Sequence, residues 1–194
     1  MGSLYNFNYE CEKILYLKKV YSSTVFVETG CFEGNTLSFA IGCKFKEYYS
    51  CDIDKDMIDH CTRRFPSSVK FFHCKSTDFL NQILPGLDHV NSIIFYLDAH
   101  LPEHDKSGGK VILDVDYNFP LEQELEIINS FRKNKQDVII ADDLRIYEDG
   151  DYTGGRWSFR EKFNLNLDFL NKFEYHVKKY YTQEGYLLLQ KQLT

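Results

Sequence analysis

Short apolar runs rich in β-branched and aromatic residues alternate along this chain with segments of helical spacing. Two of these runs, Ile93–Leu97 and Val138–Ile140, are almost continuously apolar, as strands buried on both faces of a parallel sheet are. Such alternation predicts right-handed crossovers and a parallel sheet with helices on both faces. The predicted strands are 24–27, 48–51, 69–72, 93–97 and 138–141, and the predicted helices are 9–21, 35–43, 54–64, 76–84, 120–133 and 158–171.

The C-terminal part breaks this rhythm. Residues 175–181 and 186–190 flank a short turn that contains Gly185, which predicts a β-hairpin. With the hairpin added antiparallel at its edge, the fold is α/β: a Rossmann-like, seven-stranded, mostly parallel sheet. We expect one domain over 1–194, with a leading helix within 1–22. The polar segment 101–119 is long for a loop without structure of its own, which indicates a lid loop.

Charge and cysteine usage narrow the function classes. The net charge of −6 argues against a nucleic-acid partner, which needs a basic face. No apolar run approaches the ~20 residues of a membrane span, so we expect no membrane partner. The six cysteines include no Cys-x-x-Cys pair, which indicates free thiols in a reducing compartment and predicts a cytoplasmic protein. A homodimer is compatible with the sequence.

A glycine turn joins the first predicted strand to the next helix. Gly30 and Gly34 let the backbone approach a ligand where a Cβ atom would collide. Asn35 or Thr36 can supply contacts at the helix N-terminus. Phe32 breaks the dinucleotide pattern G-x-G-x-x-G, which makes a nicotinamide cofactor less favoured.

Asp52 follows the second predicted strand. A carboxylate there can accept hydrogen bonds from both hydroxyls of a ribose, or it can cap the next helix. We assign the ribose to Asp52 and the cap to Asp54. After the third strand, Ser76 is either a ligand contact or a helix N-cap, and the sequence does not separate these roles.

Carboxylates follow two further strands. Asp98 comes directly after 93–97, with His100 two residues on, and Asp142 and Asp143 end the apolar run that begins at 138. Ligands of open α/β sheets bind beyond the carboxyl ends of the strands. Carboxylates this close repel unless a proton or a cation lies between them, and hard Mg²⁺ prefers carboxylates with water. His100 titrates near neutral pH and can take a proton. The alternative is that the acids are ordinary caps and His100 a loop histidine.

Together, Glu28-Thr29-Gly30-Cys31-Phe32-Glu33-Gly34, Asp52, Asp98 and the closing hairpin resemble the class I S-adenosylmethionine-dependent methyltransferases, over roughly residues 23–190. In that family the glycine turn cradles the methionine part of the cofactor and the second-strand acid holds the ribose. The resemblance implies the cofactor-binding residues Glu28, Gly30, Cys31, Gly34, Asn35, Thr36, Asp52, Ile53, Ser76 and Asp98. Lys75 stands where relatives often place an acid near the adenine.

The acidic pattern is similar to metal-dependent sugar O-methyltransferases related to macrocin O-methyltransferase. This resemblance implies Asp98, Asp142 and Asp143 as ligands of a divalent metal such as Mg²⁺, and His100 with Asp98 as catalytic residues. The relatives have Asp where His100 stands. The implied acceptor is a hydroxyl of a sugar or sugar nucleotide. The alternatives are another small-molecule hydroxyl, such as a catechol, and an inactive cofactor-binding module.

Two further residues allow both a functional and a structural interpretation, and two further features are given a structural interpretation alone. Arg145 can hold a substrate phosphate or pair with an acid. Trp157 can stack on a sugar or pack in the core. His104 is interpreted as an ordinary loop histidine. The glutamates at 122, 124 and 126 are interpreted as a solvated helix face.

Overall fold

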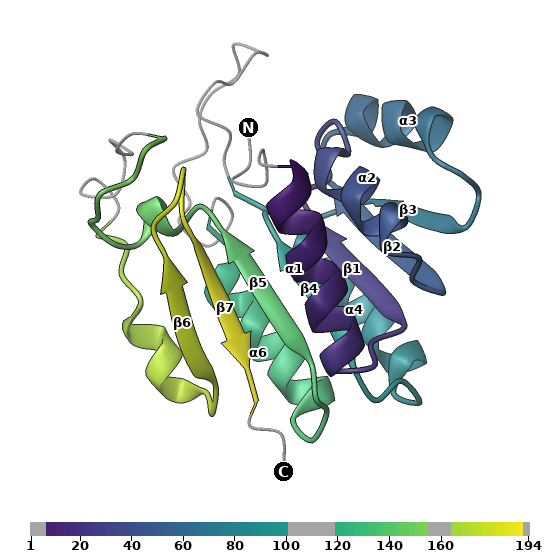
Figure 1. Ribbon diagram of the computed structural model, residues 1–194. Coiled ribbons are helices and arrows are strands. Elements are labelled where there is room, and N and C mark those ends of the chain that lie inside the picture. Colours follow the sequence, from purple (N-terminus) through teal and green to yellow (C-terminus); the bar gives the residue numbers. More distant parts are fainter. Residues whose placement is uncertain (1–6, 101–118, 155–163, 192–194) are drawn as a thin grey trace.

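All seven described strands belong to one sheet, with the order β3-β2-β1-β4-β5-β7-β6 (Figure 1). The computed structural model describes residues 7–100, 119–154 and 164–191, with side chains from Lys13 onward. Strands β1 to β5 are parallel, while β7 runs antiparallel to both β5 and β6. The strands are β1 Val25–Thr29, β2 Glu47–Asp52, β3 Val69–His73, β4 Ile93–Leu97, β5 Val138–Asp142, β6 His176–Tyr180 and β7 Tyr186–Gln190. The predicted sheet, including its antiparallel hairpin, is confirmed.

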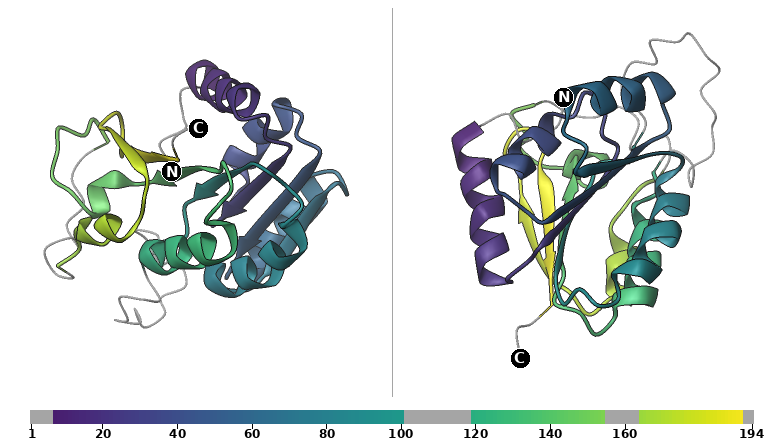
Figure 2. Two further views of the ribbon diagram at one scale, coloured as in Figure 1. Left: turned by 90° about the horizontal axis from the view of Figure 1, so that it is seen from below. Right: turned by 90° about the vertical axis from the view of Figure 1, so that its right-hand side faces the viewer.

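Helices cover both faces of the sheet, as Figure 2 shows in its edge-on view. Helices α1 and α2 pack together on one face, and α4 and α6 pack together on the other. Helix α3 packs against β2 and β3. The helices are α1 Phe7–Val20, α2 Asn35–Gly42, α3 Lys55–Arg64, α4 Ser76–Ile83 and α6 Leu121–Arg132, with 3₁₀ turns η1 Leu84–Leu87, η2 Leu144–Ile146 and η3 Asp168–Lys172.

Alternate residues of the central strands enter two separate cores. On β4, Ile94 and Tyr96 join the core under α1 and α2, whereas Ile93, Phe95 and Leu97 join the core under α4 and α6. This follows from the period of two along a strand. Since every residue of β1, β4 and β5 is buried, these strands have the apolar character seen in their sequence.

A buried ion pair closes the end of the sheet where β4 and β5 begin. Arg132 Nε lies 2.6 Å from Asp137 Oδ2, and the same guanidinium donates to the backbone carbonyls of Leu87 and Val90. Asp137 also accepts from the Ile93 backbone N–H. The pair therefore joins α6, η1 and the start of β4. The carboxyl ends of the parallel strands lie at the opposite end of the sheet.

The predicted helix at 158–171 is wrong where it can be compared. Residues 155–163 lie outside the described part, and residues 164–171 contain only the first residues of η3. Their apolar members, Leu165, Leu167, Phe169 and Leu170, are partly buried against the core. Packing of a short irregular segment therefore explains the apolar spacing that predicted a helix. The predicted lid loop 101–119 lies outside the described residues except for Phe119.

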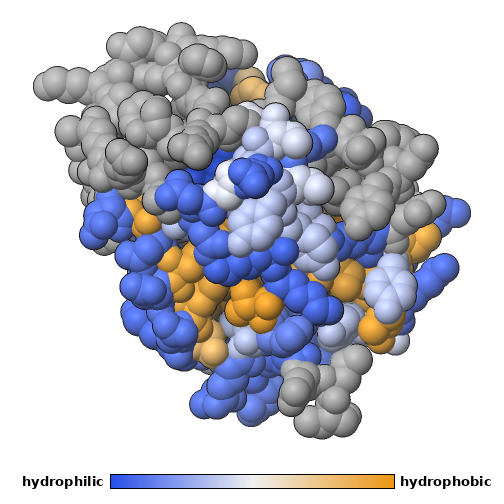
Figure 3. Space-filling view, turned by 60° about the vertical axis from the view of Figure 1, so that its left-hand side comes forward, coloured by the Kyte–Doolittle hydropathy of each residue, from blue (hydrophilic) through white to orange (hydrophobic). Residues whose placement is uncertain are grey.

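The surface beside the β6 edge is mixed in character. Figure 3 shows apolar areas there that are separated by hydrophilic side chains. Among the helices described, none is long and apolar enough to cross a membrane.

Candidate active site

The strand order reverses between β1 and β4: from β1 the chain continues to β2 and β3 on one side, and from β4 it continues to β5 on the other. In open α/β sheets a ligand binds in the crevice beyond the carboxyl ends of the strands at such a switch point. The turn after β1 and the residues after β4 and β5 lie at this end, because Thr29 pairs with Leu97 and Leu97 with Ala141. The predicted cofactor turn and the predicted acidic cluster are therefore neighbours.

The two glycines of the turn are required by contacts inside the protein. Gly30 has φ 76°, and a Cβ atom there would lie 2.5 Å from the carbonyl oxygen of Asp98. Gly34 has the same φ, and its Cβ would collide with the ring of Phe65, which follows α3. Contacts within the protein therefore already require glycine at both positions, and the approach of a ligand to this turn stays a prediction.

Asp52 holds this turn in place. Its Oδ2 accepts from the Phe32 backbone N–H at 2.8 Å, and its Oδ1 accepts from the Asp54 backbone N–H at 2.9 Å. A carboxylate has about four acceptor positions, so two remain for the hydroxyls of a ribose. Phe32 and Ile53, on either side, are 45% and 53% exposed. Asp54 caps α3 as predicted, since its side chain accepts from Asp56 and Met57.

Several predicted cofactor residues are buried and face protein groups. Glu28 accepts from the Ser50 hydroxyl at 2.6 Å, and burial raises its pKa to about 8 against that hydrogen bond. Cys31 is buried next to Cys61. Thr36 is buried, and its hydroxyl interacts with Tyr96. Asn35 is exposed. The cofactor roles of these residues stay predictions.

The acids and His100 meet at the ends of β4 and β5. His100 Nδ1 lies 3.3 Å from Asp98 Oδ1, and its Nε2 lies 2.7 Å from Asp143 Oδ2. Asp143 is also paired with Arg145, whose Nε lies 2.9 Å from Oδ1. This confirms the acid-pairing interpretation of Arg145, which is buried and also donates to the Gly154 carbonyl.

Asp142 has different partners. Its Oδ2 accepts from the Tyr96 hydroxyl at 2.5 Å and its Oδ1 from the Asp143 backbone N–H at 2.9 Å. Tyr96 was missed by the sequence analysis because it lies inside an apolar strand. Through Tyr96, Asp142 is connected to Thr36 at the start of α2.

The charges in this cluster depend on one another. Burial, followed by the charges of Asp142 and Asp143, raises the pKa of Asp98 well above its ordinary value. Burial lowers the pKa of His100, but Asp143 and Asp142 outweigh this, and the net pKa is raised. Burial raises the pKa of Asp143, but the hydrogen bonds and charges of His100 and Arg145 lower it overall. The cluster therefore favours a positive charge at its centre, and a proton on His100 supplies one.

A metal ion could supply the same charge. Asp98, His100 and Asp143 each offer one ligand atom, and these atoms all lie within 4.8 Å of one another. This group includes His100, which we predicted as a base, and does not include Asp142, whose metal role stays a prediction. An imidazole with two carboxylates suits Mn²⁺, Fe²⁺ or Zn²⁺ as well as Mg²⁺.

Glu124 lies behind the cluster, contrary to the predicted solvated face. It is 1% exposed, whereas Glu122 is half-buried, Glu126 is exposed, and both pair with Lys172. Helical spacing could have revealed this, since position 124 shares the face of Leu121, Leu125 and Ile128. Ser76 is buried and faces Glu124, and the N-cap of α4 is Lys75 without a side-chain cap.

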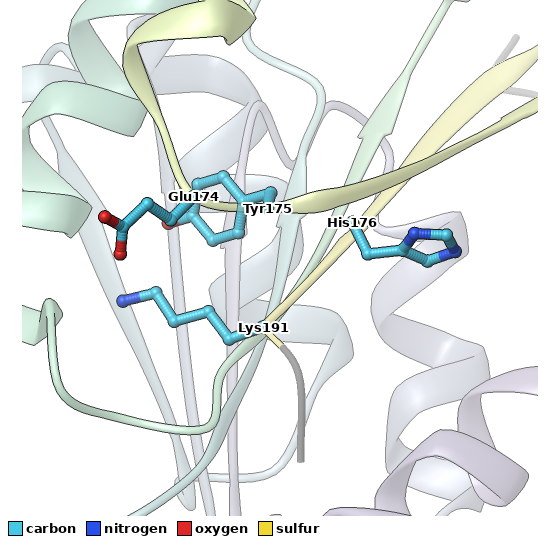
Figure 4. A pocket seen from close by; sticks show the side chains of 4 residues that line it. All are labelled: Glu174, Tyr175, His176 and Lys191. Atoms are coloured by element: carbon cyan, nitrogen blue, oxygen red, sulfur yellow. The ribbon is translucent and has the colours of Figure 1, made fainter. Parts of the chain in front are cut away.

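A surface pocket of about 540 Å³ lies at the other end of the sheet, lined by Glu174, Tyr175, His176 and Lys191. Lys191 directly follows β7, at the level where β5 begins. The Lys191 ammonium donates to the Arg132 carbonyl at 3.2 Å. Figure 4 shows the side chain of His176 pointing away from Glu174 and Lys191. Because the polar side chains of this pocket do not all point to one place, the crevice beyond the carboxyl ends of β1, β4 and β5 remains the candidate active site. Trp157 and His104 lie outside the described residues.

Comparison with known proteins supports the fold at low sequence identity. No family model matches the chain, and no curated protein does. The methyltransferase domain of bacterial CtHen1 matches with a TM-score of 0.57 and 13% identity, over 96% of this chain and 100% of that one. A putative caffeoyl-CoA O-methyltransferase from Staphylococcus aureus matches with a TM-score of 0.59 and 13% identity, over 94% and 83%.

A third match is the methyltransferase PaMTH1 from Podospora anserina, whose structure is bound to SAH. It has a TM-score of 0.53 and 14% identity, over 95% of this chain and 78% of that one. These matches extend over nearly the whole chain. The protein therefore has the fold of the class I S-adenosylmethionine-dependent methyltransferases.

Proposed function

We propose that this chain is an S-adenosylmethionine-dependent methyltransferase that methylates a hydroxyl oxygen. The observation that carries the proposal is the backbone contact of Gly30 with Asp98, which sets the cofactor turn against the acidic cluster. The structural relatives support the fold, and one of them is described as a putative caffeoyl-CoA O-methyltransferase. In such a reaction the sulfonium methyl passes to the acceptor oxygen, and the hydroxyl proton passes to a base.

The base in this proposal is His100. Its two ring nitrogens now face the carboxylates of Asp98 and Asp143, an arrangement that favours the protonated ring. A protonated ring cannot accept the hydroxyl proton, so His100 must first lose its own proton. A divalent metal held by Asp98 and Asp143 would supply positive charge and polarise the acceptor oxygen. Arg145 keeps Asp143 ionised for either role.

The acceptor that we propose is a sugar or sugar nucleotide. The support is the similarity of the acidic pattern to metal-dependent sugar O-methyltransferases, with three acids after two adjacent strands. A catechol or another small hydroxyl compound is the alternative acceptor. We further propose a cytoplasmic location, with neither a membrane nor a nucleic acid as partner, because the described cysteines are free thiols and the net charge is −6. A homodimer stays a prediction.

The test combines binding with product analysis. Calorimetry with S-adenosylmethionine, with and without Mg²⁺ or Mn²⁺, should show cofactor binding and a dependence of acceptor binding on the metal. Incubation with a panel of nucleotide sugars and catechols, followed by mass measurement, should show a gain of one methyl group. Absence of cofactor binding would refute the proposal, and cofactor binding without methylated product would favour an inactive binding module.

His100→Ala should lower turnover by about 10²–10⁴-fold while leaving cofactor affinity unchanged, since removal of a general base has effects of this size. His176→Ala is the matched control, because that exposed histidine lies at the other end of the sheet. A loss of less than about tenfold in His100→Ala would assign the base to another group.

A further inference from the structure

The ring of Tyr96 lies in the core, but its hydroxyl reaches the candidate active site. The side chain is 1% exposed and packs in the core under α1 and α2. Its hydroxyl donates to Asp142 Oδ2 at 2.5 Å, two residues beyond Ile140, which is the partner of Tyr96 in the sheet. A phenylalanine would fill the same space in the core, so packing alone does not explain the hydroxyl.

The hydroxyl of Tyr96 has one proton, which sets the direction of the hydrogen bonds around it. An ionised carboxylate can only accept a hydrogen bond, so the proton of Tyr96 is used on Asp142. The hydroxyl of Thr36, which is also hydrogen-bonded to Tyr96, therefore donates to the tyrosine oxygen. Thr36 is 9% exposed and is the second residue of α2, directly after the glycine turn. The hydrogen bonds thus run from the start of α2 to Asp142.

Asp142 continues this path to the group that could hold a cation. While its Oδ2 accepts from Tyr96, its Oδ1 accepts from the Asp143 backbone N–H at 2.9 Å. Asp143 has φ 55°, in the left-handed region that residues other than glycine adopt rarely. The bond to Asp142 helps to hold this backbone conformation. The carboxylate of Asp143 supplies one of the three ligand atoms that lie within 4.8 Å of one another, with Asp98 and His100.

A second buried tyrosine lies beside Asp142 without taking part in this path. Tyr186 is the sheet partner of Asp142 on β7 and is 2% exposed. Its hydroxyl makes no hydrogen bond to the residues that the structure describes. The two tyrosines are therefore matched in burial and differ in whether the hydroxyl binds the carboxylate.

We propose that Tyr96 is a positioning residue that couples the binding of S-adenosylmethionine to the binding of a divalent cation. This inference rests on the proposed function, because it takes the glycine turn as the cofactor site and the carboxylates of Asp98 and Asp143 as the cation site. With its proton on Tyr96, the Thr36 hydroxyl offers its oxygen to a donor such as the ammonium group of the cofactor. Hydrogen bonds in a chain strengthen one another. The ligand that binds first orders Thr36, Tyr96 and Asp142, and the second ligand then meets side chains that are already ordered.

The test measures two affinities by calorimetry. The affinity for S-adenosylmethionine is measured in EDTA and in saturating Mn²⁺, and the affinity for Mn²⁺ is measured with and without S-adenosylmethionine. The ratio of each pair is the coupling factor, which must be the same from both sides. Tyr96→Phe removes the hydroxyl and keeps the ring, and Tyr186→Phe is the matched control. Thr36→Val removes the first hydroxyl of the path, and Thr36→Ser keeps it.

We expect the unaltered protein to bind S-adenosylmethionine about 5–150-fold more tightly in Mn²⁺ than in EDTA, the usual range for two coupled sites. Tyr96→Phe and Thr36→Val should each reduce this factor to about twofold or less, because either change interrupts the path. Tyr186→Phe and Thr36→Ser should keep the factor of the unaltered protein. A purely structural role of Tyr96 would lower the melting temperature and leave the factor unchanged.

An unchanged coupling factor in Tyr96→Phe would overturn the inference, and so would a factor near one in the unaltered protein. If Tyr96→Phe does not fold, the Thr36 variants decide, since equal factors in Thr36→Val and Thr36→Ser overturn the inference. Binding of S-adenosylmethionine without any binding of a divalent cation would overturn the inference and leave the methyltransferase proposal standing. Coupled binding of both ligands without methylation of any hydroxyl would refute the proposed function alone. If neither ligand binds, both proposals fail.

Discussion

The backbone of Gly30 lies directly against the carbonyl group of Asp98, so closely that a Cβ atom at position 30 would be 2.5 Å from the Asp98 oxygen. The Asp98 backbone N–H donates to the Thr29 carbonyl at 3.0 Å, which holds the same two segments together. One contact thus sets the distance between the turn proposed for the cofactor and the cluster proposed for the chemistry. A change at position 30 should therefore affect both stability and cofactor binding.

Gly30→Ala should lower the free energy of unfolding by about 2–3 kcal/mol, because the residue has φ 76° and its new methyl group would meet backbone atoms that cannot move aside. Urea titration measures this loss, and calorimetry should show weaker binding of S-adenosylmethionine. Gly42→Ala is the control, since nothing lies within 4 Å of a Cβ at that position. Equal stability of the two variants would contradict the prediction.

Glu28 should make the protein less stable as the pH rises. Its carboxyl ionises near 4.5 in the unfolded chain and near 8 in the folded protein, where burial disfavours the charge. Between these values the unfolded state has lost a proton that the folded state retains. The free energy of unfolding therefore falls from about pH 4.5 to about pH 8 and is not lowered further above it, with a total change on the order of 5 kcal/mol.

Replacement of Glu28 by Gln removes this dependence. Urea titrations at pH 5.5 and pH 8.5 should show that the variant loses less stability than the unaltered protein over this range. Glu126→Gln, at an exposed position, should leave the pH dependence unchanged. The same pH dependence in Glu28→Gln as in the unaltered protein would mean that Glu28 is charged in the folded state.

Arg132→Met should lower the free energy of unfolding by about 3–5 kcal/mol, because it leaves the carboxylate of Asp137 buried without its partner. The exposed Arg63 provides the control, and Arg63→Met should change stability by about 0.5 kcal/mol or less. Denaturant unfolding at pH 7 measures both. A loss below about 1 kcal/mol in Arg132→Met would show that Asp137 finds another partner.

A divalent cation should stabilise the protein by binding the carboxylates of Asp98 and Asp143, which lie next to each other beside His100. At 100 times its Kd, an ion that binds only the folded state adds about 2.7 kcal/mol, and EDTA should remove this gain. Thermal melts with Mg²⁺ and Mn²⁺ compare the two ions. Asp143→Asn should abolish the effect, whereas Asp59→Asn should retain it, because Asp59 lies on α3 and pairs with Lys55 there. An unchanged effect in Asp143→Asn would place the ion elsewhere.

The sheet could be predicted from sequence because each strand has a recognisable local pattern of apolar residues. Ile93–Leu97 was predicted with the bounds of β4, since a continuous apolar run between polar residues has few other interpretations. The helix expected near 158–171 was wrong over its described part, because Leu165, Leu167 and Phe169 are partly buried without forming an α-helix. Apolar spacing reports which side chains are buried and not which backbone conformation buries them.

The acids of the site were found from their places after strands, but their pairings were not. Whether Asp142 or His100 joins Asp98 and Asp143 depends on side-chain directions, and Tyr96 decides this by donating to Asp142 from the neighbouring strand. Glu124 was missed for another reason. It was grouped with Glu122 and Glu126 by its charge. Residues two positions apart lie on nearly opposite sides of a helix, however, so Glu124 lies on the buried side.

The strand order also bears on how the sheet is completed. Strand β7 lies between β5 and β6, so one edge of β5, which is apolar from Val138 to Ala141, stays unpaired until residues some fifty positions later arrive. Strands β6 and β7 are joined by a short turn and can pair with each other first. Docking of that hairpin is then the step that protects β5 from pairing with another chain. During synthesis on a ribosome, the interval before this docking is when the protein is most exposed to aggregation.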